Sequence, residues 1–210
     1  QPPLYKVAKG RSEVYLKDAA ALDRYLVEAG TAGRMLETSG GARSGAELQE
    51  LVEHAMRMRS LMGFVPRRYD PAVIEALALS GALEHDLDRA GREAALVRTA
   101  EWLGRGDREA KWSAVLREDG SVLIERVWRG VTDAYPIDAA FLVSAGARKL
   151  ARLAGEHAAV YSGTARLVRA SAASEAEPET GSDEAGEDAA PARAQTLDGT
   201  IIRPSQLLDA

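Results

Sequence analysis

The sequence predicts an α+β fold, in which helices and short antiparallel strands or hairpins form one compact domain. Three observations support this prediction. A Leu and Met stripe recurs at helical spacing over residues 44–62, Asp119-Gly120 separates two strand-like runs, and strands and helices do not alternate regularly as in a βαβ fold. The 210 residues, of which 46% are hydrophobic, suffice for one sizeable core or two small ones.

The first part of the chain is expected to contain a hairpin, a helix and a strand. Residues 3–7 and 13–16 are rich in strand-forming side chains and are separated by a turn. Asp18 is a candidate N-cap for a helix that ends at Gly30. A short strand is expected over residues 34–38.

The middle of the chain is expected to be helical. Ser44 is a candidate cap and Gly63 a candidate stop for the clearest helix. Its apolar stripe, expected to be core rather than a ligand groove, consists of Leu48, Leu51, Val52, Ala55, Met58 and Met62. Asp70-Pro71 pairs an N-cap with proline at the first helical position, and a further helix is expected over residues 92–103.

The strongest strand prediction lies in the second half of the chain. Residues 111–118 and 121–130 flank Asp119-Gly120, a dipeptide that favours a tight hairpin turn. The remaining expected elements are a helix over 144–161, a strand over 165–169, a short strand over 196–202 and a helix start at 203–205.

Composition and charge exclude several classes of protein. The absence of cysteine excludes disulfides, thiol chemistry and cysteine-type zinc sites. No apolar run reaches the roughly 18 residues of a membrane span, so a soluble cytoplasmic protein without a membrane partner is expected. The net charge is −5, but nine acids against two arginines give residues 171–210 a net −7, which leaves +2 for residues 1–170.

The acidic residues are concentrated in one segment. Residues 171–194 hold seven acids and no Leu, Ile, Val or aromatic side chain. Such a segment buries too little apolar surface to offset the entropy of ordering, so we expect an acidic disordered linker. A solvated tether is favoured over electrostatic mimicry of nucleic acid.

Few residue patterns point to catalysis. The three histidines, His54, His85 and His157, lie far apart in the sequence, and we expect no shared ligand set. Glu84, Asp86 and Asp88 surround His85, but a capping or turn role is favoured for them. No glycine-rich phosphate loop and no nucleophile elbow is present in the sequence.

Basic residues offer the only candidate binding site. Lys6, Lys9 and Arg11 cluster at the first hairpin and are the candidate DNA-proximal residues, since Lys and Arg neutralise phosphates without reading sequence. Other basic side chains, at 57, 59, 67, 68, 166 and 169, are expected to be ordinary solvated charges.

Several segments resemble the B subunit of DNA gyrase, a type IIA topoisomerase. The opening QPPLYKVAKGRSEVYLKD resembles the strand that leaves the metal-binding TOPRIM domain of that family. The segments that follow, in the order expected for a long insertion found in many Gram-negative gyrase B subunits, are MRSLMGFVPRRYDPAVIEAL, VLIERVWRGVTDAYPID, SAGARKLARLAGE and TLDGTIIRPSQLLDA.

The resemblance implies a domain organisation. Residues 1–9 are expected to be the end of a host TOPRIM strand, 10–170 an α+β insert domain, 171–194 the acidic linker, and 195–210 a return to the host through a strand and a truncated helix start. Both ends of the sequence are therefore expected to be joined to a larger body.

The resemblance also implies a function. The parent would be an ATP-dependent enzyme that supercoils DNA by double-strand passage, with ATP and Mg²⁺ bound outside this segment and with the A subunit, the rest of the B subunit and duplex DNA as partners. The segment itself is expected to carry no catalytic, cofactor or metal residue, and to buttress the DNA-binding core and couple DNA binding to ATP turnover.

Two other functions remain open from the sequence. One is an independent nucleic-acid-binding adaptor that uses the basic hairpin, which steeply salt-dependent DNA binding would support. The other is a hydrolase that uses His85 with neighbouring carboxylates, which would be excluded if His85→Ala had no functional consequence.

Overall fold

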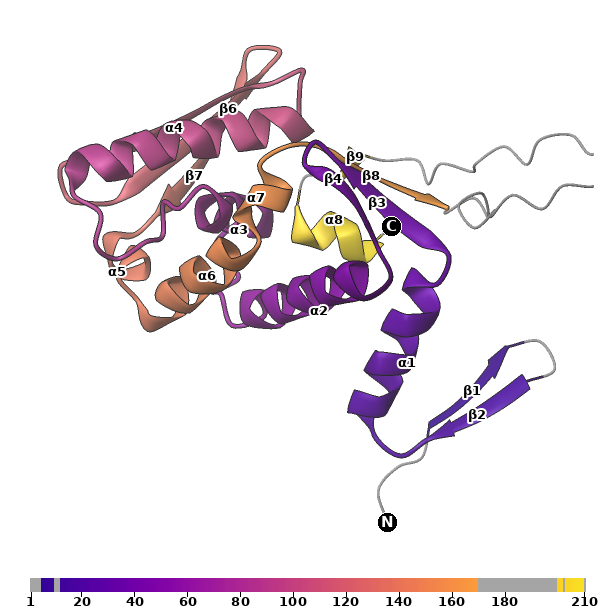
Figure 1. Cartoon of the computed structure of the whole chain (residues 1–210). Helices are drawn as coiled ribbons and strands as arrows, with labels where there is room; N and C mark the ends of the chain where they lie inside the picture. The colour runs from indigo at the N-terminus through magenta and orange to yellow at the C-terminus, as the bar shows by residue number, and fades with distance from the viewer. Residues whose placement is uncertain (1–4, 10–11, 170–199, 202, 210) are drawn as a thin grey trace, which may run out of the picture. The chain divides into compact units, whose positions relative to one another are not determined.

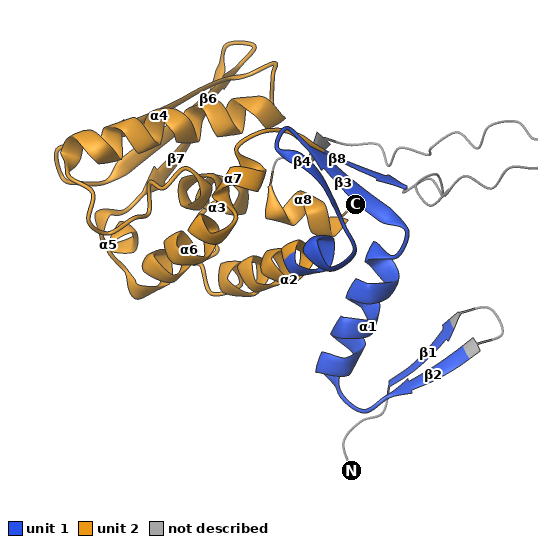
Figure 2. Ribbon diagram, viewed as in Figure 1, with its two compact units in different colours: residues 1–50, 166–199 blue, residues 51–165, 200–210 orange. Residues whose placement is uncertain are grey.

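The computed structural model describes residues 5–9, 12–169, 200–201 and 203–209 (Figure 1). Helices and small antiparallel sheets occur together, which confirms the predicted α+β class. The acidic segment 171–194, Arg11 and the turn at Gly10 lie outside the described residues. The chain divides into two compact units, residues 1–50 with 166–199 and residues 51–165 with 200–210 (Figure 2).

The first unit contains the predicted hairpin, formed by β1 (Tyr5–Lys9) and β2 (Ser12–Leu16) in antiparallel register. Asp18 caps α1 (Ala19–Thr31) as expected, because its Oδ1 accepts a hydrogen bond of 2.7 Å from the Ala21 amide. The helix continues to Thr31, one residue beyond the predicted stop.

A small sheet completes this unit. The predicted strand is present as β3 (Arg34–Thr38), and it lies between β4 (Gly41–Ser44) and β8 (Ala165–Arg169). Ser44, the predicted helix cap, is the last residue of β4 and lies directly before the helix that follows. The helix α2 (Gly45–Met62) starts at Gly45, whose φ of +54° suits glycine.

The second unit is built around a helix that is apolar on nearly all sides. In α3 (Pro71–Leu79) every residue from Val73 onward is buried, and Asp70 caps the helix through the amides of residues 72 and 73. It packs against α4 (Arg89–Gly106) and α6 (Ala145–Glu156). The shorter elements of this unit are α5 (Ala139–Leu142), α7 (Ala158–Tyr161), β9 (Thr200–Ile201) and α8 (Pro204–Asp209).

One predicted helix is divided in two. The expected helix over residues 144–161 is capped by Ser144, but it breaks between α6 and α7 at His157, whose φ of −128° is not helical. The His157 ring packs edge-on against His54, with the ring centroids 4.5 Å apart. This tertiary contact, which the local sequence does not encode, accompanies the break.

A three-stranded antiparallel sheet packs on α4 through its first strand. The predicted hairpin is present as β5 (Lys111–Leu116) and β6 (Val122–Trp128). A third strand, β7 (Val131–Ile137), was not expected. Its first four residues are exposed and include a polar pair, Thr132 and Asp133, so the strand lacks the apolar alternation that would predict it.

The turn between β5 and β6 supplies a first test of this architecture. Gly120 has a φ of +79°, and a Cβ there would meet only the Ala139 Cβ at 3.6 Å, so Gly120→Ala introduces backbone strain without a clash. We expect a loss of about 1–2 kcal/mol in the free energy of unfolding, measured by urea denaturation.

The matched control is Gly104→Ala within α4. A Cβ at Gly104 meets no atom within 4 Å, and alanine favours the helix, so this variant is expected to gain roughly 0.5–1 kcal/mol. If alanine increased the free energy of unfolding at both positions, the turn conformation at Gly120 would not require glycine.

Candidate functional site

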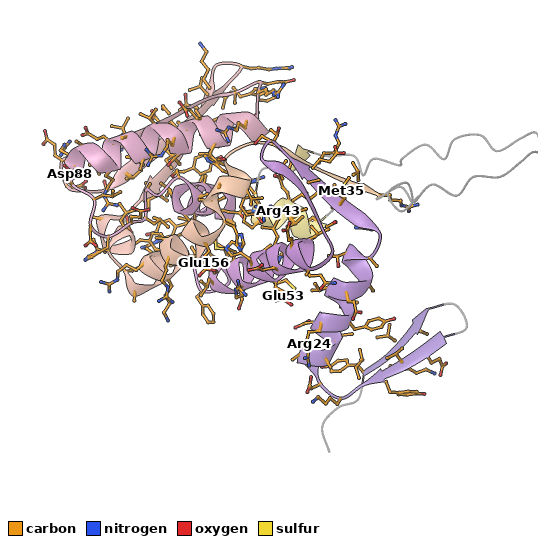
Figure 3. The ribbon with its side chains drawn as sticks, viewed as in Figure 1. Arg24, Met35, Arg43, Glu53, Asp88 and Glu156 are labelled. Carbon is orange, nitrogen blue, oxygen red and sulfur yellow. The ribbon has the colours of Figure 1, made fainter. Side chains whose placement is uncertain are left out.

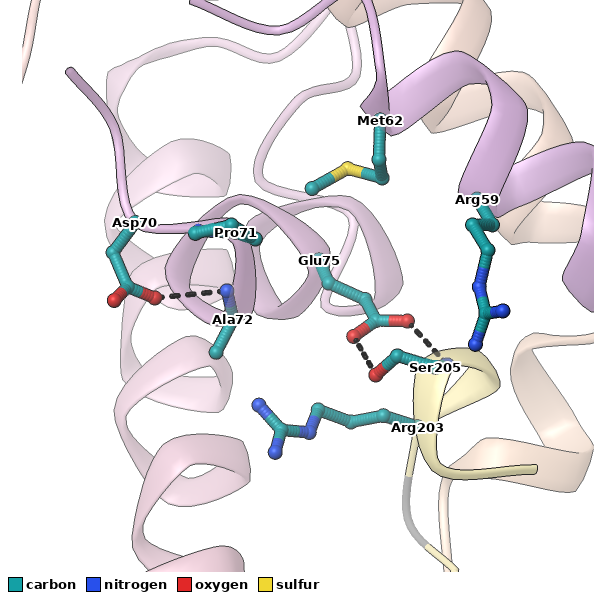
Figure 4. Close-up of a pocket in the computed structure, with 8 residues that line it drawn as sticks. All are labelled: Arg59, Met62, Asp70, Pro71, Ala72, Glu75, Arg203 and Ser205. Atoms are coloured by element: carbon teal, nitrogen blue, oxygen red, sulfur yellow. Dashed lines mark hydrogen bonds between the residues drawn. The ribbon is translucent and has the colours of Figure 1, made fainter. Parts of the chain in front are cut away.

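The most unusual polar group of the second unit is a carboxylate inside its core. Glu75 lies on the buried helix α3 and is only 5% exposed. It borders a pocket of about 380 Å³ (Figure 4). The other residues that line this pocket are Arg59, Met62, Asp70, Pro71, Ala72, Arg203 and Ser205.

Both oxygens of Glu75 are engaged by one residue 130 positions later in the chain. The Ser205 amide donates to Oε1 at 2.9 Å, and the Ser205 hydroxyl donates to Oε2 at 2.7 Å. Ser205 is in the first turn of α8, where backbone amides lack partners within the helix. Glu75 therefore acts as a cap for α8 that is supplied by another helix.

The electrostatics of this contact contain opposing effects. Burial raises the pKa of Glu75, and the hydrogen bonds from Ser205 and the charges of Arg203 and Arg59 oppose that rise. Arg59 forms an exposed ion pair with Asp209 at 2.8 Å, which is a second link to α8. The Arg203 Nε is buried and has no hydrogen-bond partner within the described parts of the chain.

A second buried polar group lies between α2 and α6. His54 has no exposed surface, and its Nε2 donates to the Leu153 carbonyl oxygen at 2.7 Å. Its ring contacts His157 edge-on and stacks at 6.4 Å from Tyr161. Burial lowers the pKa of His54, while the hydrogen bond to Leu153 opposes this effect.

Two of the histidines come together in the fold. His54 and His157 are far apart in sequence, but their rings are in contact. His54 is fully buried, and its Nδ1 has no partner among the described residues. His85 is exposed. Asp88, which is labelled in Figure 3, caps α4 through a hydrogen bond from the Gly91 amide, as expected.

Polar atoms of Glu75 and His54 form hydrogen bonds between helices. The Glu75 oxygens are both occupied by Ser205, and the His54 Nε2 is occupied by a backbone carbonyl. Within residues 5–9, 12–169, 200–201 and 203–209, no group of three His, Asp or Glu side chains is arranged to hold a metal ion. The contacts hold helices together, because Glu75 links α3 to α8 and His54 links α2 to α6.

The candidate DNA-proximal residues are only partly described. Lys6 lies on β1, where its Nζ forms an ion pair of 2.7 Å with Glu13 and lies 5.9 Å from the centre of the Tyr15 ring. Lys9 is the last residue of β1, and Arg11 is outside the described residues. The assignment of these three residues to DNA binding stays a prediction.

Sequence reasoning missed the Glu75–Ser205 contact. One local feature pointed to half of it, because Glu75 is the only charged residue within the apolar run PAVIEALAL. A charged residue in a fully buried helix needs a partner. The identity of that partner depends on tertiary structure, since Ser205 follows 130 residues later.

Comparison with known proteins places similar sequences in one family. A family profile described as "GyrB, hook" matches residues 3–29. The B subunit of DNA gyrase from Caulobacter vibrioides is 36% identical over 170 residues, which cover 80% of this chain and 20% of that protein. The same protein from Rickettsia bellii is 28% identical over 137 residues, or 63% of this chain and 17% of that protein.

The matching region is a small part of these relatives. The chain spans about a fifth of the length of the gyrase B subunits that it matches first. A third relative, the gyrase B subunit of Myxococcus xanthus, is 32% identical over 79 residues, which are 38% of this chain and 10% of that protein. In the described part of the chain, no helix combines the length and the apolar composition needed to cross a membrane.

Proposed function

Since this chain is related in sequence to a segment of the DNA gyrase B subunit, we propose that it is a non-catalytic insert of such a protein. The proposed parent is the ATP-dependent enzyme that supercoils DNA by double-strand passage. The insert interrupts the TOPRIM domain, buttresses the DNA-binding core and couples DNA binding to ATP turnover. Its partners are the rest of the B subunit, the A subunit and duplex DNA, while ATP and Mg²⁺ bind elsewhere in the parent.

The observation that carries this proposal is the similarity over 170 residues of the chain. The contact between Glu75 and Ser205 adds support, because it ties the last helix of the second unit to its central helix. A domain that couples conformational changes in the parts of the parent on either side of it needs such fixed contacts between its own helices. The hydrogen bonds formed by both Glu75 oxygens and by the His54 Nε2 also support a mechanical role rather than a catalytic one.

A deletion in the parent tests the proposal. Removal of residues 10–193 is expected to reduce DNA binding and DNA-stimulated ATP turnover to different extents, because coupling is lost while the catalytic groups remain elsewhere. DNA cleavage is expected to persist. The three activities and supercoiling are measured separately on the purified enzyme.

A shorter deletion serves as the control. Removing only residues 171–194 leaves the described elements in place and is expected to have a much smaller effect. An equal loss of every activity in the long deletion would indicate misfolding of the host and would count against a coupling role, as would full activity in all assays.

A further inference from the structure

A hollow on the second unit lies between α2 and α6, and none of its lining residues takes part in the contact between Glu75 and Ser205. Its volume is about 330 Å³. Helix α2 contributes Arg57, Ser60 and Leu61 to its lining, and helix α6 contributes Lys149, Arg152, Leu153 and Glu156.

The charges in this hollow are mostly positive. Three cations face a single carboxylate, that of Glu156, which is labelled in Figure 3. Glu156 lies 3.7 Å from Arg57, in an ion pair whose two side chains are about half exposed. Lys149 and Arg152 are exposed and form no ion pair within the part of the chain that the structure describes.

The spacing of the cations suits a row of negative charges. Lys149 and Arg152 are three residues apart on α6, so they are neighbours on one helix face, with about 5–6 Å between their Cβ atoms. Arg57 approaches from the facing helix, and Arg148 adds an exposed cation one turn before Arg152.

We propose that this hollow binds the phosphate backbone of duplex DNA. The proposal rests on the proposed function, because it assumes that the segment works beside DNA, and it assigns the DNA contact to α2 and α6. The three cations of the hollow exceed its one carboxylate, and no aromatic side chain of the described residues lines it. Of its two leucines, Leu153 is buried and Leu61 is partly covered. Protein partners usually engage central apolar or aromatic anchors, whereas phosphates require only charge.

The test compares DNA binding by the full 210-residue chain and its Lys149→Ala/Arg152→Ala variant. Binding to a fluorescently labelled duplex is measured by anisotropy between about 50 and 200 mM salt. Two lost phosphate contacts are expected to weaken binding about tenfold, and to reduce the slope of log affinity against log salt by about 0.9 for each contact. Alanine favours helices, so circular dichroism should show α6 intact.

Two controls separate the site from net charge. Arg108→Ala/Arg117→Ala removes the same charge at two exposed positions outside the hollow, and it is expected to retain most of the affinity and the slope. Lys149→Arg/Arg152→Lys preserves the charge and should bind as the unchanged chain does.

Three results would overturn the proposal. The first is no binding by the unchanged chain at the lowest salt concentration. The second is an equal loss in the hollow variant and in the Arg108/Arg117 control. The third is displacement of DNA by polyglutamate at equal charge concentration, which would point to an acidic protein partner instead.

The DNA site and the coupling role can fail independently of each other. If the long deletion uncouples ATP turnover while Lys149→Ala/Arg152→Ala in the intact parent does not change DNA affinity, the coupling role stands and the DNA site fails. If the variant loses DNA affinity but the long deletion leaves coupling unchanged, the DNA site stands and the coupling role fails.

Discussion

Glu75→Ala is expected to lower the free energy of unfolding of the chain by about 2–3 kcal/mol. The substitution removes the acceptor for both the amide and the hydroxyl of Ser205. Hydrogen bonds to a charged group contribute roughly 1.5–3 kcal/mol each, but the cost of burying the carboxylate offsets part of that gain. Helix α8 is too short to be stable alone, so it should detach locally.

Urea denaturation measures the loss of stability, and amide hydrogen exchange over residues 203–209 measures the detachment of α8. The conservative control is Glu75→Gln. Its carbonyl oxygen can accept from the Ser205 amide while its amide donates to the Ser205 hydroxyl, so the loss should stay below about 1 kcal/mol. Unchanged exchange in Glu75→Ala would show that other contacts hold α8.

The titration of Glu75 can be isolated by comparing the chain with Glu75→Gln, in which position 75 does not titrate. The measured quantity is the difference between their free energies of unfolding, chain minus variant, as a function of pH. Burial raises the pKa of Glu75 above its ordinary value of 4.5, so the folded chain binds this proton more tightly than the unfolded chain. The difference should be largest below pH 4.5 and should decline as the pH rises through the raised pKa.

Local elements were predictable where one short pattern determines the backbone. Asp70-Pro71 supplies both a cap and a preset φ. Asp119-Gly120 favours a hairpin turn, in which Gly120 adopts a φ of +79°. Both predictions were confirmed. The Asp18 cap was confirmed for the same reason, since the interaction spans only three residues.

Elements without such patterns were missed. The exposed first half of β7 has no apolar alternation, and β4 is a short strand that begins at a glycine. The break at His157 accompanies a contact with His54, more than a hundred residues earlier. Periodicity within a window of residues contains no information about such distant partners.

The candidate sites show the same limit. Lys6, Lys9 and Arg11 were chosen because they are close in sequence, but the Lys6 charge is paired with Glu13. The cations of the α2 and α6 hollow come from helices separated by more than 80 residues, so only the fold brings them together. The basic residue at 57 was noted in the sequence, but those at 149 and 152 were not.

His54→Ala is expected to reduce the free energy of unfolding by about 3–4 kcal/mol. His54 is fully buried, so the smaller side chain leaves a cavity. The change also removes the donor to the Leu153 carbonyl, which belongs to the last four residues of α6 and needs a partner from outside the helix. Urea denaturation is the measurement, and His85→Ala, at an exposed position, should change stability by less than about 0.5 kcal/mol.

His54→Leu separates the two contributions, because leucine refills most of the volume but leaves the carbonyl unpaired. It is expected to recover roughly half of the loss seen with alanine. Equal losses in the leucine and alanine variants would show that the hydrogen bond, and not the cavity, determines the effect.

The pH dependence gives an independent check on His54. Burial lowers its pKa below 6.5, and the nearby charges of His157 and Arg57 act in the same direction, while the Leu153 hydrogen bond and Glu156 oppose them. The folded chain therefore binds this proton less tightly than the unfolded chain, and stability is fully present above pH 6.5 and declines as the pH falls toward the lowered pKa. His54→Leu should flatten this decline, and an unchanged acid profile would assign the loss to other groups.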